Sequence, residues 1–478
     1  MSTAAGRTGV RARRDLLRLP VLGALLRHRW GRLALQLPFL IGAAVLVYDG
    51  FTGDQLAPRN LATVVPWVHV RGILVLALLL GGNFFCMTCP FTLPRTLAKR
   101  LSLASRRFPR ALRGKGIAIL SLIGLFFAYE WLNMWSSPLL TAWVIVAYFA
   151  AAFIFEALFS ESAFCKYICP LGSFNFTYAA VSPTQIGVHD ADVCRTCVGK
   201  ECLNGSYAAQ TVILIDQIGI DGAPDRTHTH SPQGTPGCGT LLFAPQIKGN
   251  ADCTLCLDCA RACPHENVGL FTRAPGAELV RADAAPRRWD SALLIVVLTA
   301  LGLVNAFGMV PPVYPLMQAI ASASGLTRLG FTDRLVEGIA LALIFGVGIA
   351  LVVLATIAAT WIARMLTRTA RRDTLRAAYT AFAPALVPIG FGVWGAHYGF
   401  HFLIGFMEAE IVALIQVIAL VGGFAGSMWV AQTIAARLYR RDALIGLLPW
   451  ALVMLALMGV GWWLFSLPME MRGTIVFG

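Results

Sequence analysis

Four closely spaced cysteines are the residues best suited to chemistry in this sequence. They form the run Cys253-x2-Cys256-x2-Cys259-x3-Cys263, followed directly by Pro264. This spacing is typical of [4Fe–4S] ligands, because three thiolates in one tight loop reach three irons of a cubane, while the fourth commonly serves a second cluster. Zinc is the alternative, but four cysteines so close together match no ordinary zinc pattern. The run therefore predicts iron–sulfur chemistry.

A second set of cysteines lies upstream and could supply the partner that a crossed fourth ligand requires. Its members are Cys194, Cys197, Cys202 and Cys238. By the logic of two-cluster proteins, one cluster takes Cys194, Cys197, Cys202 and Cys263, and the other takes Cys253, Cys256, Cys259 and Cys238. An uncrossed arrangement is the alternative. The insert 203–237, which contains His228 and His230, is expected to be a surface loop.

The last four cysteines form two pairs, each followed by proline. They read Cys86-Met-Thr-Cys89-Pro90 and Cys165-Lys-Tyr-Ile-Cys169-Pro170. Both pairs follow an apolar segment, so all four thiols could converge at one membrane face. The alternatives are a third cluster, a zinc ion or two redox dithiols, with plain packing of small side chains as the structural interpretation.

The elements that position these cysteines are predicted to be membrane helices. The 478 residues are 57% hydrophobic and 13% charged, whereas soluble proteins carry about 25% charged residues. This composition excludes an ordinary soluble enzyme and a disordered chain. Nine apolar segments reach membrane length. They lie at about 33–50, 66–85, 116–135, 139–160, 291–311, 336–360, 378–402, 410–434 and 443–466.

The distribution of Lys and Arg predicts the orientation of these spans. Loops on one side hold 24 Lys and Arg, and the opposite loops and tail hold four. The positive-inside rule therefore places the N-terminus and the stretch 162–289 in the cytoplasm and the C-terminus outside. All cysteines then lie on a side where disulfides are rare. The stretch 162–289 is nearly neutral, so the formal charge of +14 belongs to loops flanking the membrane and indicates no nucleic-acid partner.

The predicted fold class is thus a polytopic α-helical protein of the cell membrane, with about nine spans and an inserted cytoplasmic α+β module. Four parts are expected: a basic N-terminus (1–32), a four-helix membrane domain (33–161), the cysteine-bearing domain (162–289) and a five-helix membrane domain (290–478). Pro384 and Pro388 predict a kink in the seventh span. Arg13 and Arg14 are expected to anchor the N-terminus at the lipid interface.

Ionisable residues inside predicted spans form a second candidate site. His397 and His401 are four residues apart on one helical face, and His69, Arg71 and Glu130 fall near the same outer end of the spans. Neutral histidines could bind a quinone carbonyl, with haem b as an alternative. The structural alternative is interfacial histidines paired with a carboxylate or with backbone, and Glu130 paired with Arg71.

The cysteine motifs and the spans around them resemble the membrane polyferredoxins of the NapH/NosR type. The resemblance covers about residues 30–270 and rests on Cys86 to Pro90, CKYICPLGSF at 165–174 and CTLCLDCARACPHENVGL at 253–270. It implies a ferredoxin-type domain with [4Fe–4S] clusters, and electron transfer between the quinone pool and a soluble redox partner such as a ferredoxin or a reductase subunit. The first pair is CxxCP, where the family more often has CxxxCP. The extra C-terminal spans look similar to a longer, FesM-like subgroup.

The function predicted from the sequence is membrane-bound electron transfer between a cytoplasmic redox partner and the quinone pool, with this chain as the electron-transfer subunit of a quinone oxidoreductase. Two alternatives remain open. One is an assembly or regulatory factor, without enzymatic activity, that delivers electrons to another metalloenzyme. The other is a redox-sensing transporter, against which the absence of an obvious inverted repeat argues.

Overall fold

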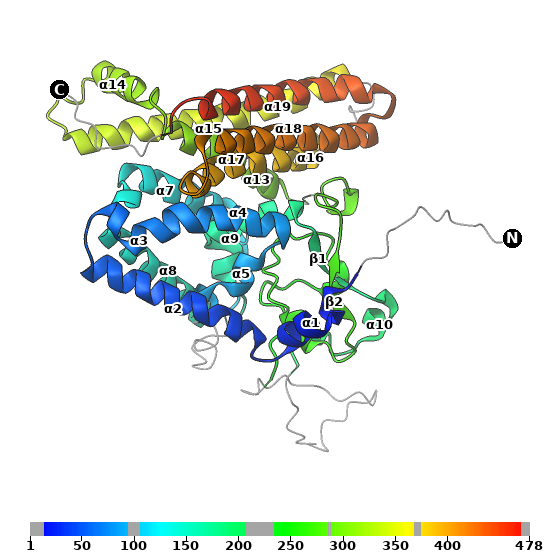
Figure 1. Cartoon of the computed structure of the whole chain (residues 1–478). Coiled ribbons are helices and arrows are strands. Elements are labelled where there is room, and N and C mark those ends of the chain that lie inside the picture. The colour runs from blue at the N-terminus through cyan, green and yellow to red at the C-terminus, as the bar shows by residue number, and fades with distance from the viewer. Residues whose placement is uncertain are drawn as a thin grey trace.

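The computed structural model describes residues 14–93, 106–206, 234–284, 286, 288–367 and 374–469 (Figure 1). It is mostly helical, and within these residues seven helices are long and apolar enough to cross a membrane. They are Gly31–Thr52, Leu61–Leu80, Pro138–Leu158, Trp289–Phe307, Asp333–Leu366, Leu375–Leu403 and Ala409–Phe465. The predicted span at 116–135 corresponds to a shorter apolar helix, Gly116–Trp131. These helices agree with the expectation of a helical, multi-pass membrane protein. Arg13, His228 and His230 lie outside the described residues.

The N-terminal helices form one layer of the bundle. They are α2 (Gly31–Thr52), α3 (Leu61–Val64), α4 (Arg71–Leu80), α7 (Gly116–Trp131) and α8 (Pro138–Leu158). A π-helical segment, Val65–Val70, joins α3 to α4 and contains Pro66, which lacks the backbone N–H that a regular helix would use. Helix α8 begins at Pro138, and the hydroxyl of Ser137 accepts a hydrogen bond from the N–H of Leu140.

The C-terminal helices form a second layer against the first (Figure 1). They are α13 (Trp289–Phe307), α14 (Val313–Ser324), α15 (Asp333–Leu366), α16 (Leu375–Phe382), α17 (Val387–Leu403), α18 (Ala409–Tyr439) and α19 (Ala443–Phe465). Helix α13 lies at the centre of this layer, since 83% of the residues in its apolar stretch are buried. The predicted kink at Pro384 is present as a 3₁₀ turn, Ala383–Leu386, between α16 and α17. Arg440, with φ of 50°, separates α18 from α19.

Glycines bring α17 and α18 unusually close together. A Cβ atom on Gly423 would lie 2.7 Å from the carbonyl oxygen of Pro388, and one on Gly392 would collide with the carbonyl of Ala419. Such small residues let two helix backbones approach in a membrane. These two helices also make the most extensive helix–helix contact among the described elements.

The cysteine-rich module is inserted between α8 and α13, at one end of the helix layers (Figure 1). Its strands β1 (Thr184–Val188) and β2 (Val268–Thr272) form a two-stranded antiparallel sheet, with Ile186 opposite Leu270. Three short helices carry or flank the cysteines: α10 (Ala191–Thr196), α11 (Glu201–Asn204) and α12 (Asp258–Ala262).

The described part of the N-terminal segment packs on this module. The carboxylate of Asp15 accepts hydrogen bonds from the N–H of Leu270 at 3.0 Å and from His189 Nε2 at 3.1 Å. The carbonyl oxygen of Arg14 accepts a hydrogen bond from the N–H of Thr272 at 2.9 Å. Helix α1 (Pro20–Arg27) follows, and the apolar cluster of the module includes its residue Leu26. Arg14 therefore contacts β2, a partner that the interface-anchor hypothesis did not foresee.

Candidate iron–sulfur sites

The first group of thiols lies on the side of the module away from the helices and is called the distal group. It consists of Cys194, Cys197, Cys202 and Cys263, which line one small cavity. Burial, together with the thiolates of its neighbours, raises the pKa of Cys202 to about 11. The amide of Asn267 donates a hydrogen bond to Cys194 Sγ at 3.2 Å. The four cysteines thus border one shared space.

The second group, called the proximal group, is deeper in the module. It consists of Cys238, Cys253, Cys256 and Cys259, three of which are buried. Burial raises the pKa of Cys259 well above its ordinary value, and the thiolates of Cys256, Cys238 and Cys253 raise it further, in that order. The two groups are the sets that the crossed arrangement predicts from the sequence.

Strained backbone surrounds both groups. Six non-glycine residues of the module have positive φ between 47° and 61°: Lys200, Leu241, Asp252, Leu255, Leu257 and Glu266. Each such residue costs about 1–2 kcal/mol, and strain of this kind persists where a site over-determines the chain. Directly after Leu241, the N–H of Leu242 donates to Cys238 Sγ at 3.3 Å. Backbone N–H groups directed at sulfur are a means of tuning iron–sulfur clusters.

The third group lies where the membrane helices reach the module and is called the membrane group. It consists of Cys86, Cys89, Cys165 and Cys169. Cys86 lies on α5 (Phe84–Thr88), Cys165 lies in a π-helical segment (Phe164–Ile168), and Cys169 caps α9 (Pro170–Tyr178). The structure brings all four together, since Cys165 is within electrostatic range of the other three thiols.

Hydrogen bonds to sulfur also occur in the membrane group. The N–H of Gly172 donates to Cys169 Sγ at 3.2 Å, and Asn175 Nδ2 donates to Cys86 Sγ at 3.5 Å. Each Cys–Pro pair ends one helical segment and begins the next, because proline is favoured at the first position of a helix. The interruption of the helix therefore leaves the sulfur beside the free N–H groups of the segment that follows.

Shared apolar packing and hydrogen bonds connect the three groups in the order distal, proximal, membrane. Cys202 of the distal group and Cys253 of the proximal group belong to one buried apolar cluster, which also contains Met87 from α5. Asn83 Nδ2 donates to the carbonyl oxygen of Cys253 at 2.8 Å. On the other side, Lys166 Nζ donates to the carbonyl oxygen of Thr240 at 2.5 Å. The proximal group thus sits between the other two.

The donor sets fit iron–sulfur clusters. Each group offers four thiols, and burial raises the pKa of Cys256 to about 11, so cluster assembly there must displace protons. In the part of the chain that the structure describes, no three His, Cys, Asp or Glu side chains are arranged to hold a single metal ion.

Arg71 is the centre of a separate buried cluster at the start of α4. Its guanidinium carbon lies 4.2 Å from the ring centre of Tyr129, 4.6 Å from that of Trp67 and 5.1 Å from that of Tyr398. Arg71 Nη1 is buried without a hydrogen-bond partner among the described residues. A caged cation of this kind inside a membrane bundle is a functional candidate.

The histidines predicted from the sequence are placed in two environments. His397 and His401 are buried with ring centres 5.2 Å apart, and His397 Nε2 lies 3.3 Å from Met309 Sδ. His69 is half-buried and contacts Phe402, with 6.1 Å between ring centres. The quinone and haem interpretations of these three residues stay predictions.

Glu130 has a partner that the sequence hypothesis did not name. Its Oε1 accepts a hydrogen bond from Asn305 Nδ2 at 2.8 Å, and both side chains are fully buried. Asn305 lies on α13, in the C-terminal layer. This hydrogen bond therefore ties the two layers together inside the bundle.

Sequence reasoning missed the asparagines that support the thiols: Asn83, Asn175, Asn250 and Asn267. All four are buried. Asn175 and Asn267 donate to cysteine sulfurs, and Asn83 donates to the carbonyl oxygen of Cys253. The carbonyl oxygen of Asn250 accepts from the N–H of Cys253, while its amide donates to the carbonyl oxygen of Ala179. The signal in the sequence was an asparagine close to a cysteine motif, in a chain that is largely apolar. Asn250, for example, stands three residues before Cys253.

Comparison with known proteins gives one distant relative at significant similarity. The chain is 26% identical over 178 residues to the ferredoxin-type protein NapH of Haemophilus influenzae. The match covers 34% of this chain and 60% of the relative, so the chain spans less than two thirds of that relative's length. No protein-family profile matches the chain. No solved structure matches it.

Proposed function

We propose that this protein is a membrane-bound iron–sulfur protein that relays electrons between a soluble redox partner and the quinone pool. The observation that carries the proposal is the series of three four-thiol groups, from the distal group to the ends of the membrane helices. The similarity to a ferredoxin-type protein supports the same class of function. The quinone and the soluble partner are part of the proposal.

A cluster bound by each group would accept and donate one electron at a time. The chain's own residues would set how easily this happens. N–H donors on sulfur, such as Gly172 and Asn267, stabilise the more negative state of a cluster. Burial of the proximal group acts in the opposite direction, because a low-dielectric interior disfavours added charge. The buried cluster that contains Cys202, Cys253 and Met87 would hold the groups near one another.

The proposed topology has nine spans with the module in the cytoplasm. Helix α7 is counted as a span, and α18 and α19 as two, because Arg440 divides them. The excess of Lys and Arg on the module side supports this orientation. The expected location is the cell membrane, with the N-terminus inside and the C-terminus outside.

Iron stoichiometry tests the proposal. Protein purified and reconstituted without oxygen should contain about twelve iron atoms per chain if all three groups hold cubanes. The double variant Cys86→Ser with Cys169→Ser should contain about eight, and so should Cys256→Ser with Cys259→Ser. Electron paramagnetic resonance of the dithionite-reduced samples should lose a different signal in each variant.

Two results would contradict parts of the proposal. Stoichiometric zinc without iron would end the electron-transfer function. About eight iron atoms in the wild type, unchanged in the Cys86→Ser with Cys169→Ser variant, would show that the membrane group acts as dithiols.

Thiol labelling of intact cells tests the topology, since labelling of the module cysteines from outside would reverse the orientation.

A further inference from the structure

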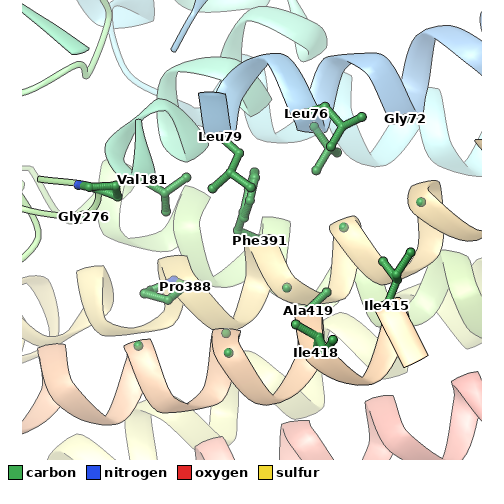
Figure 2. A pocket seen from close by; sticks show the side chains of 18 of the residues that line it. Gly72, Leu76, Leu79, Val181, Gly276, Pro388, Phe391, Ile415, Ile418 and Ala419 are labelled. Atoms are coloured by element: carbon green, nitrogen blue, oxygen red, sulfur yellow. The ribbon is translucent and has the colours of Figure 1, made fainter. Parts of the chain in front are cut away.

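A large apolar cavity lies between α4 on one side and α17 and α18 on the other (Figure 2). Its volume is about 590 Å³, which is in the range of sites for small molecules and cofactors. Leu79 from α4 and Phe391 from α17 point toward each other across it (Figure 2). One end is bounded by Val181 and Gly276, and the other by Gly72 and Ile415.

The lining determines which chemical class can occupy this cavity. None of its lining side chains is charged, and among them Trp429 alone has a polar atom. At Gly399 and Gly422, a Cβ atom would meet no atom of the described chain within 4 Å. These two positions therefore leave space that the protein itself does not fill. The occupant must be long and apolar along most of its length.

One end of the cavity is connected to the proximal thiol group. Val181, in the cavity wall, ends the short turn Ala179–Val181. Asn250 Nδ2 donates to the carbonyl oxygen of Ala179 at 2.8 Å, and the carbonyl oxygen of Asn250 accepts from the N–H of Cys253 at 3.1 Å. A single asparagine thus links the turn that contains Val181 to the backbone of Cys253, one of the proximal cysteines. An occupant with a redox-active head would have it next to the electron path.

The predicted histidines belong to a different face of α17. Cavity-lining positions on this helix include Gly395, Gly399 and Phe402, whereas His397 and His401 are not among the lining residues. With 100° per residue, His397 projects from the side of the helix opposite Gly399 and Gly395. The cavity and the histidine cluster are therefore two separate features.

We infer that this cavity binds a membrane quinone, with its prenyl tail along the glycine-bearing faces of α17 and α18 and its ring at the end near Val181 and Gly276. The inference rests on the proposed function and adds the location of its quinone site. Reduction of one quinone to the quinol takes two electrons, one from each of two reduced clusters, and two protons from solvent.

Filling the tail region tests the inference. Gly399→Leu should place a side chain in the cavity without a clash, and Gly422→Leu is a second variant of the same kind. The matched control is Gly459→Leu on α19, an exposed glycine outside the cavity whose Cβ would also meet nothing within 4 Å. Iron content is measured first, and any variant that retains wild-type iron is used.

The assay follows anaerobic reoxidation of dithionite-reduced clusters by two probes, ubiquinone-2, which has a short prenyl tail, and ubiquinone-0, which has none. We expect Gly399→Leu or Gly422→Leu to raise the half-saturating concentration of ubiquinone-2 by about tenfold, because two or more apolar carbons lose their burial. The value for ubiquinone-0 should change by less than about twofold, and Gly459→Leu should match the wild type with both probes.

Three results would count against the inference, and they are distinguishable. If both cavity variants match the wild type with ubiquinone-2, the cavity holds something else, such as a phospholipid acyl chain. If both probes are weakened equally, the tail does not lie along α17 and α18. If wild-type clusters are reoxidised by neither probe, the quinone partner of the proposed function fails as well.

Discussion

Two buried arginines, Arg273 in the module and Arg71 in the helix bundle, are held by different kinds of partner. Arg273 donates to the carbonyl oxygens of Ser182, Ala179 and Ala180 at 2.9–3.1 Å and pairs with Glu278. Three aromatic rings surround the guanidinium of Arg71, and its Nη1 lacks a hydrogen-bond partner among the described residues.

This difference separates a structural charge from a functional candidate. A guanidinium with backbone carbonyls and a carboxylate around it is fully compensated, so it fixes the module on the helices. A guanidinium surrounded by rings is stabilised less, and its burial in a membrane bundle is costly. Burial of the Arg71 charge is unfavourable, and no structural role of Arg71 is as clear as that of Arg273.

The largest expected effect is that of Arg273→Met, which would leave Glu278 buried without its cation. We expect the free energy of unfolding to fall by about 3–5 kcal/mol and the iron content to drop, because Glu278 also accepts from the N–H of Asn250 beside the proximal group. Denaturant titration and iron analysis measure both. The control is Arg281→Met, whose partially exposed pair with Asp283 should contribute less than about 1 kcal/mol. Equal effects of the two variants would break the comparison.

A smaller effect is expected from Arg71→Met. Arg71→Met removes the contacts with three rings, but it also removes a buried charge that is costly in a membrane bundle, so the free energy of unfolding should change by less than about 2 kcal/mol in either direction. The iron content should stay at the wild-type value. The same titration and iron analysis apply, with Arg59→Met as an exposed control that should have almost no effect. If Arg71→Met removed iron as Arg273→Met does, Arg71 would belong to the electron path and not to a separate cluster.

The smallest effect on electron transfer is expected from the double variant His397→Ala with His401→Ala. The sequence alone predicts slower reoxidation of the clusters by quinone, since histidines can bind a quinone carbonyl. The cavity beside α4 predicts a half-saturating ubiquinone-2 concentration within about twofold of the wild type, because the histidines do not line it. A tenfold increase in variants with full iron content would favour the histidine site over the cavity.

Much of the architecture follows directly from the sequence. Long apolar segments predict membrane helices because an uncompensated backbone is too costly in lipid. The described residues contain seven helices long and apolar enough to cross a membrane and one shorter apolar helix, and these cover the predicted segments. The spacing from Cys253 to Cys263 is equally local, since a tight loop can present three thiols to one cluster whatever the rest of the chain does. The kink predicted at Pro384 is likewise present, as the 3₁₀ turn Ala383–Leu386.

Only the tertiary structure decided what lies next to what. The approach of Cys165 to Cys86, the aromatic cage of Arg71 and the pairing of Glu130 with Asn305 join residues that are far apart in the chain. The packing of Arg14 and Asp15 on β2 and the cavity between α4 and α17 are of the same kind. Local patterns specify helices and loops through backbone propensity and apolar periodicity. Contacts between distant segments depend on how side-chain volumes pack in three dimensions, and no local spacing encodes that.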